Sequence, residues 1–128
     1  MGTRLYLGQE SWLGHGDRRW ALPQPALDGE PPTAMALEAA IGQLEEVIMP
    51  LARDLPPGTA LKLDGPGANA FDLPLALAAV EAAFGDLARA AERRSYVGGP
   101  AFSPAQVSWL LTLREVMHHL GFTEASRA

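Results

Sequence analysis

The chain has 128 residues, a length typical of one domain, and no cysteine, which excludes disulfides, thiolate catalysis and cysteine-based metal sites. Its formal net charge is −5 and its arginines are scattered, so we expect no nucleic acid partner. No apolar run approaches the roughly 18 residues of a membrane span, and the start lacks the apolar core of a signal peptide. We therefore expect a cytoplasmic protein without membrane contact, and we attribute its alanine-rich, lysine-poor composition to bacterial codon bias.

The N-terminal segment, residues 1–22, is predicted to be extended. Leu5 and Leu7 alternate with other residues at the period of a half-buried strand. Two further runs, ESWL and RRWAL, flank a glycine-rich loop at 14–17 and favour a β-hairpin. The segment 23–32 carries four prolines and is expected to be an irregular connection.

The first predicted helix begins after Thr33, a suitable N-cap, and carries an apolar stripe at helical spacing. It should kink or end near Met49, because Pro50 cannot donate a backbone hydrogen bond. A short strand is expected near 60–63, where two leucines alternate with Lys62.

Two more helices are predicted in the second half of the chain. The first of them should start near Asp72, which is another suitable N-cap. The last should run from 104 to about 120, because residues 103–106 read as a capping box with proline at the first helical position. Gly121 is the expected left-handed residue after this helix.

Together these elements predict an α+β fold in the order β-β-α-β-α-α. The N-terminal hairpin and the one short strand should form a small antiparallel sheet, packed with three amphipathic helices in a helical core spanning 33–121. The alternative is a three-helix bundle with a β arm. The chain should be a single domain over 1–128, and the heptad-like stripes are compatible with a homodimer.

A histidine pair near the C-terminus raises the question of a metal site. Glu115 precedes His118 by three residues, which is half of the ligand motif of a di-iron bundle. On a helical wheel Glu115 and His119 fall opposite the apolar face, and His118 lies on its flank. The other predicted helices have no ionisable residue at the centre of their apolar stripes. We therefore predict no metal and no cofactor, and interpret these three residues as a helix end with an i, i+4 ion pair.

Two other motifs are interpreted as structural. The stretch 64–70 fits a Gly-x-Gly-x-x-Ala pattern, but Pro66 removes an amide that phosphates would use, and a tight turn is the simpler interpretation. Ser11 lacks the glycine spacing of a nucleophile elbow. No catalytic residue is assigned.

The N-terminal hairpin is the strongest candidate for a partner-binding surface. Tryptophan and arginine are enriched at interface hot spots. The competing interpretation is that both hairpin tryptophans pack on the helices as part of the core. The candidate partner-binding residues are Trp12, His15, Asp17, Arg18, Arg19 and Trp20.

Two classes of function follow. The first is a small acidic protein that binds another protein, as an accessory factor, a chaperone, or an antitoxin or immunity protein, and its charge is compatible with a basic partner. The second is a small enzyme or ligand-binding domain whose site is assembled only in three dimensions. A deep pocket lined by Arg114, His118 and a carboxylate of another helix would favour the second class.

Overall fold

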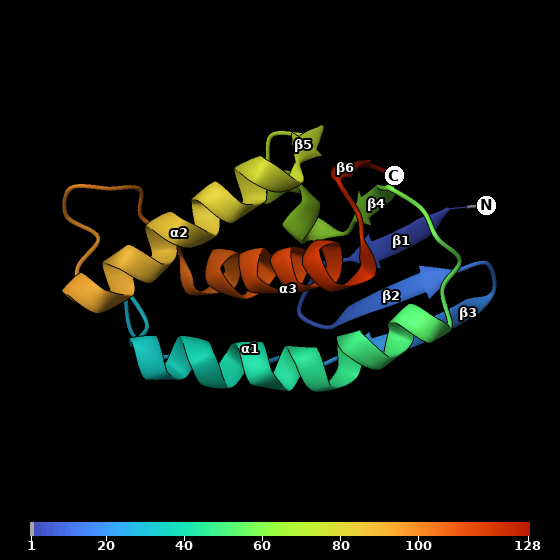
Figure 1. Ribbon diagram of the computed structural model, residues 1–128. Helices are drawn as coiled ribbons and strands as arrows, with labels where there is room; N and C mark the ends of the chain where they lie inside the picture. Colours follow the sequence, from blue (N-terminus) through green and yellow to red (C-terminus); the bar gives the residue numbers. More distant parts are fainter. Residues whose placement is uncertain (1) are drawn as a thin grey trace.

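The computed structural model of the protein describes residues 2–128, and in this range it has an α+β fold with a six-stranded mixed sheet (Figure 1). The strand order is β3-β2-β1-β4-β6-β5. Neighbouring pairs are antiparallel, except that β1 pairs in parallel with β4 and β4 with β6. The strands are Thr3–Tyr6 (β1), Ser11–His15 (β2), Arg18–Leu22 (β3), Ala60–Asp64 (β4), Leu75–Ala76 (β5) and Glu124–Arg127 (β6).

The helices pack on one face of this sheet and extend beyond it, with α3 lying between α1 and α2 (Figure 1). Within residues 2–128, no helix combines the length and the apolar character needed to cross a lipid bilayer. The α-helices are Ala34–Ile48 (α1), Leu77–Arg93 (α2) and Pro104–Leu120 (α3), and two 3-10 helices span Met49–Arg53 (η1) and Pro66–Ala70 (η2).

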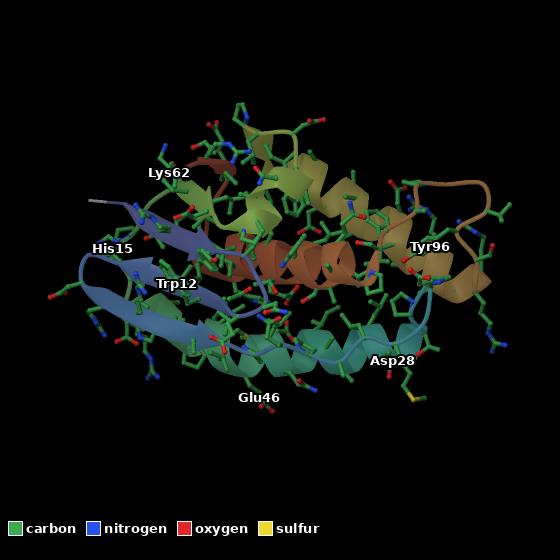
Figure 2. All side chains as sticks on the ribbon, turned by 180° about the vertical axis from the view of Figure 1, so that it is seen from behind. Trp12, His15, Asp28, Glu46, Lys62 and Tyr96 are labelled. Atoms are coloured by element: carbon green, nitrogen blue, oxygen red, sulfur yellow. The ribbon has the colours of Figure 1, made fainter. Side chains whose placement is uncertain are left out.

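The core lies between the helices and the inner face of the sheet. Alternate residues of the strands point inward, and Leu5, Leu13, Leu61 and Leu63 are completely buried. They join one apolar cluster with the buried residues of α1, α2 and α3. The outer face of the sheet has no helix over it within residues 2–128, as the view from behind shows (Figure 2).

The predicted sheet of three antiparallel strands is wrong, and so is the predicted element order. The helical crossover through α1 joins β3, which runs in the same direction as β1, to β4, and α2 and α3 lie between β4 and β6. These connections return the chain in the same direction, which gives the parallel pairs β1–β4 and β4–β6. Strands β5 and β6 were also not expected from the sequence. The segment TEASR has little of the β-branched or aromatic character of strands, yet Ala125 in β6 is completely buried beside Leu61.

The helix boundaries agree with the sequence at α1 and α3 but not at α2. Thr33 caps α1 by accepting a hydrogen bond from the backbone of Ala36, and α3 begins at Pro104. By contrast, α2 begins at Leu77 and not near Asp72. Leu75 and Ala76 form β5 and pair with β6, and this pairing delays the start of the helix.

The capping box of α3 provides a test of local stability. Ser103 Oγ accepts a hydrogen bond from the backbone of Gln106 at 3.2 Å, and Gln106 Oε1 accepts one from the backbone of Ser103 at 2.8 Å. Ser103→Ala should therefore lower the free energy of unfolding by about 1 kcal/mol in urea titrations. Ser103→Asp retains an acceptor and should remain near the wild-type value; an equal loss in both variants would contradict the cap assignment.

Candidate functional site

The outer face of the sheet carries an aromatic and cationic stack across β1, β2 and β3. Tyr6 and Trp12 are cross-strand partners, and their rings are stacked with 5.4 Å between centroids and 2° between planes. The guanidinium carbon of Arg19 lies 3.9 Å from the centre of the Trp12 ring. Trp12 is thus flanked by Tyr6 on β1 and by Arg19 on β3, and these three residues are called the Trp12 platform.

Glycines make room for the platform. A Cβ atom on Gly14 would lie 2.9 Å from Cζ3 of Trp12, so the indole ring occupies the space above that glycine. A Cβ atom on Gly8 would lie 2.8 Å from Cε1 of Tyr6. Both aromatic rings therefore lie over glycine backbone, which allows this close approach.

Exposed cations surround the platform. Arg4 lies 3.9 Å from Asp64, and the Lys62 ammonium donates to Ser126 at 3.0 Å. Among residues 2–128, no carboxylate lies within 4.0 Å of Arg19 or of Lys62. Within residues 2–128, Arg19 and Lys62 are therefore cations of the outer face without a carboxylate partner, while Asp64 and Glu124 place negative charges on the same face.

The structure separates the two tryptophans that the sequence analysis grouped together. Trp20 pairs with Leu13 and packs against the apolar core, on the face opposite to Trp12. Arg18 lies over Trp20, with its guanidinium carbon 4.7 Å from the ring centre. Its Nη2 is also 3.9 Å from the Oδ1 of Asp54. Arg18 and Trp20 thus connect the hairpin to η1 and the core.

The remaining candidates lie at the hairpin turn. The predicted four-residue loop is a two-residue turn, Gly16-Asp17, because Gly14 and His15 belong to β2 and Gly16 adopts a positive φ of 63°. His15 Nδ1 lies 3.1 Å from the hydroxyl of Thr3 on the neighbouring strand. His15 therefore bridges two strands, and only Asp17 remains in the turn.

The expected outward position of Glu115 is wrong. Its side chain is 0% exposed, because α1 covers the flank of α3 that the helical wheel assigned to solvent. His119 on the same flank is 19% exposed, whereas His118 is 53% exposed. Glu115 and His119 meet Glu45 of α1 in this position, and these three residues are called the acid–histidine cluster.

Ion pairs connect the acid–histidine cluster to α2. His119 Nε2 lies 2.9 Å from Glu45 Oε2 and 3.2 Å from Glu115 Oε1. The other Glu115 oxygen accepts from Arg114 Nη1 at 2.8 Å, and Arg114 Nε donates to both oxygens of Glu81 at 3.2 and 3.3 Å. Glu45 and Glu81 were not predicted as members of this site, because nothing in their spacing relates them to residues on α3.

No known protein family matches this sequence, and no curated protein gives a significant match. The Trp12 platform and the acid–histidine cluster are therefore interpreted from their own geometry. The two sites are separate: the platform lies on the outer face of the sheet, and the cluster lies between α1 and α3.

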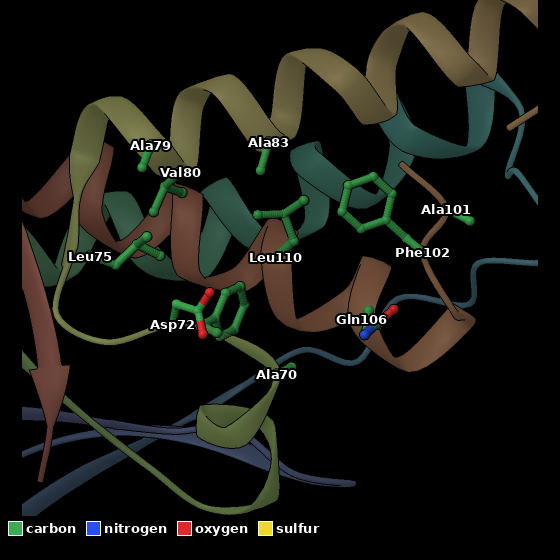
Figure 3. A pocket seen from close by; sticks show the side chains of 11 residues that line it. Ala70, Asp72, Leu75, Ala79, Val80, Ala83, Ala101, Phe102, Gln106 and Leu110 are labelled. Atoms are coloured by element: carbon green, nitrogen blue, oxygen red, sulfur yellow. The ribbon is translucent and has the colours of Figure 1, made fainter. Parts of the chain in front are cut away.

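A third feature is an apolar pocket of about 280 Å³ between α2, α3 and the segment that leads into β5 (Figure 3). Its polar groups are Asp72 at one side and Gln106 at another. Arg114 and His118 do not line it, so this pocket is not the one that would have favoured an enzyme. The lining residues are Ala70, Phe71, Asp72, Leu75, Ala79, Val80, Ala83, Ala101, Phe102, Gln106 and Leu110.

Tyr96 lies near this pocket and tilts against Phe102, with 6.1 Å between ring centroids. Its hydroxyl is buried and has no hydrogen-bond partner within residues 2–128. Burial raises the pKa of Tyr96 above its usual value of 10.0, and the negative charge of Glu30 raises it further. The phenol is therefore neutral at physiological pH and adds no charge to the pocket.

Proposed function

We propose that this protein acts by binding another protein through the outer face of its sheet, with Trp12 at the centre of the contact. The observation that carries the proposal is the Trp12 platform, in which a half-buried indole is pre-oriented by Tyr6 and Arg19. Tryptophan and arginine dominate interface energetics because they bury a large area, and a ring already held in place loses little entropy on binding.

Two cations without a carboxylate partner within residues 2–128 favour a partner segment that combines an acidic side chain with an apolar one. Arg19 is exposed within the platform and Lys62 is exposed on the same face of the sheet, and an incoming carboxylate would pair with either. The basic partner suggested by the net charge is the alternative. It would bind the acidic face of α1, where Glu38 and Glu46 are exposed.

The β3 edge of the sheet is a second reason to place the partner at this surface. Within residues 2–128, β3 pairs only with β2, so its other edge carries backbone N–H and C=O groups that no strand of this range pairs with. A partner strand added to β3 would lie next to Arg19 and close to Trp12. Such a partner would combine backbone pairing at the edge with side-chain contacts on the outer face.

Comparing Trp12→Ala with Trp20→Ala tests the proposal, because the two rings lie on opposite faces of one hairpin. We expect Trp12→Ala to weaken binding by about 2 kcal/mol or more, with little loss of stability. Trp20→Ala should lower the melting temperature and leave the affinity of the folded protein nearly unchanged. A co-purifying protein would be identified first, and its affinity then measured by calorimetry.

Charge reversals identify the face that the partner uses. Lys62→Glu should lower the affinity for an acidic partner, whereas Glu46→Lys on α1 should leave that affinity unchanged. Unchanged affinity in both Trp12→Ala and Lys62→Glu would refute the proposal. A loss confined to Glu46→Lys would place the partner on α1.

A further inference from the structure

We propose that the acid–histidine cluster, formed by Glu45, Glu115 and His119, binds a divalent transition-metal ion, with zinc as the best-matched ion. The candidate ligand atoms are one carboxylate oxygen from each glutamate and Nε2 of the histidine. This site is independent of the Trp12 platform, and it was not expected from the sequence because its third ligand comes from another helix.

The distances within the acid–histidine cluster suit a metal. All three ligand atoms lie within 4.8 Å of one another, and His119 Nε2 is 2.9 and 3.2 Å from the two carboxylates. Zinc holds nitrogen and oxygen ligands at about 2.0–2.2 Å, so tetrahedral ligands lie roughly 3.3–3.6 Å apart. Small side-chain movements would therefore bring the three atoms onto one ion.

An unsatisfied buried oxygen is the independent indication of a ligand. Glu115 Oε1 is buried and accepts no hydrogen bond from any group within residues 2–128, although His119 Nε2 is 3.2 Å away. The imidazole is hydrogen-bonded to Glu45 at 2.9 Å instead. A buried carboxylate oxygen without a donor is costly, and coordination of a cation would satisfy it.

Arg114 orients the carboxylate of Glu115 as a metal ligand. Its Nη1 holds the second oxygen of Glu115 at 2.8 Å, which leaves the first oxygen directed towards His119 and Glu45. Arg114 is itself held by Glu81 and stacks on the ring of Phe84 at 4.3 Å. Such outer contacts orient ligand carboxylates in metal sites.

The charge around the cluster also favours a cation. Glu45, Glu81 and Glu115 contribute three carboxylates, and in the described range 2–128 Arg114 is the one arginine paired with them. His118 lies 3.6 Å from Glu81 and contacts the edge of His119. A divalent ion bound to a neutral His119 would offset the excess negative charge without a protonated imidazole.

The ligand set and its exposure select the kind of ion. One imidazole nitrogen and two carboxylate oxygens suit zinc, which also binds nitrogen sites more tightly than manganese or iron(II). Three protein ligands leave a fourth position for water, as in zinc sites that act on substrates. Glu45 is 36% exposed, so the ion can reach the cluster from solvent.

Zinc titration of chelator-treated protein tests the site. We expect one equivalent of zinc to bind and to raise the melting temperature. Glu45→Gln should weaken the affinity at least about tenfold, because it removes a ligand while nearly preserving shape. Glu46→Gln is the matched control, since Glu46 is the next residue of α1 and projects away from the protein (Figure 2), and its affinity should equal that of the wild type.

Cobalt(II) gives a second measurement, because its visible absorption reports the ligand geometry of the bound ion. His118→Ala should retain the cobalt spectrum, whereas His119→Ala should lose it. The proposal is overturned if the wild-type protein shows no saturable zinc binding, or if Glu45→Gln and Glu46→Gln bind zinc equally well. Glu45 is partly exposed, so Glu45→Gln can be measured even if His119→Ala does not fold.

Discussion

Replacing Arg114 by methionine should lower the free energy of unfolding by about 3 kcal/mol or more. The reason is the burial of Glu115, whose side chain is 0% exposed and whose Oε2 accepts from Arg114 at 2.8 Å. Without the guanidinium group, a buried carboxylate loses its donor and its counter-charge together. Methionine retains much of the packing on Phe84, so the loss would report the charge and not the volume. Urea unfolding in the presence of chelator gives the value.

Arg89→Met is the matched control. Arg89 contacts Asp86 at 2.6 Å, but this pair lies on the exposed side of α2, and we expect a loss below about 1 kcal/mol. Adding Glu115→Gln to Arg114→Met should recover part of the stability, because a neutral amide is less costly to bury than a carboxylate. A loss below about 1 kcal/mol in Arg114→Met would show that Glu115 does not depend on this partner.

The helix ends were predictable because their signals are local. Thr33 and Ser103 accept hydrogen bonds from residues three positions ahead, and such contacts depend only on the adjacent sequence. Gly121 adopts a positive φ of 80°, and the backbone of Phe122 donates to Met117, as expected after a helix. Periodicity and capping therefore located α1 and α3.

Burial of the polar flank of α3 was not predictable in the same way. A helical wheel shows which residues share a face, but it does not show how many faces are covered. α3 lies between α1 and α2, so Thr112 and Glu115 are buried although they lie away from the apolar stripe. The expected Glu115–His119 contact exists at 3.2 Å, but it lies in the interior and includes Glu45.

The arrangement of the sheet could not be predicted, because it depends on backbone pairing that side-chain patterns do not show. The backbone amides of Thr123 and Glu124 donate to Thr59, and Ala128 donates to Leu63, so the C-terminal segment is held by its main chain. The separation of the tryptophans, by contrast, could have been read from the sequence. A two-residue turn after position 15 and a four-residue turn after position 13 both place Trp12 and Trp20 on opposite faces.

Replacing Gly67 by valine should lower the free energy of unfolding by about 3 kcal/mol, at the upper end of the usual cost of overpacking. Gly67 belongs to the Gly-x-Gly-x-x-Ala stretch, and the structure gives this glycine a packing role. A Cβ atom here would lie 2.5 Å from the Cβ of Leu7 and 2.8 Å from Cδ2 of Trp109. Its backbone N–H also donates to Leu7 O at 2.8 Å, so the main chain cannot move aside without losing a hydrogen bond.

Gly58→Val is the matched control, since a Cβ atom on Gly58 would meet nothing within 4 Å. We expect this variant to remain within about 0.5 kcal/mol of the wild type. Gly67→Ala should fall between the two valine variants, because it adds the clashing Cβ without the branches. Trp109 donates from its indole nitrogen to Gly8 O at 3.2 Å, so displacing its ring also disturbs the loop between β1 and β2. Equal melting curves for Gly67→Val and Gly58→Val would show that the contact with Leu7 and Trp109 relaxes freely, and the glycine would then need another explanation.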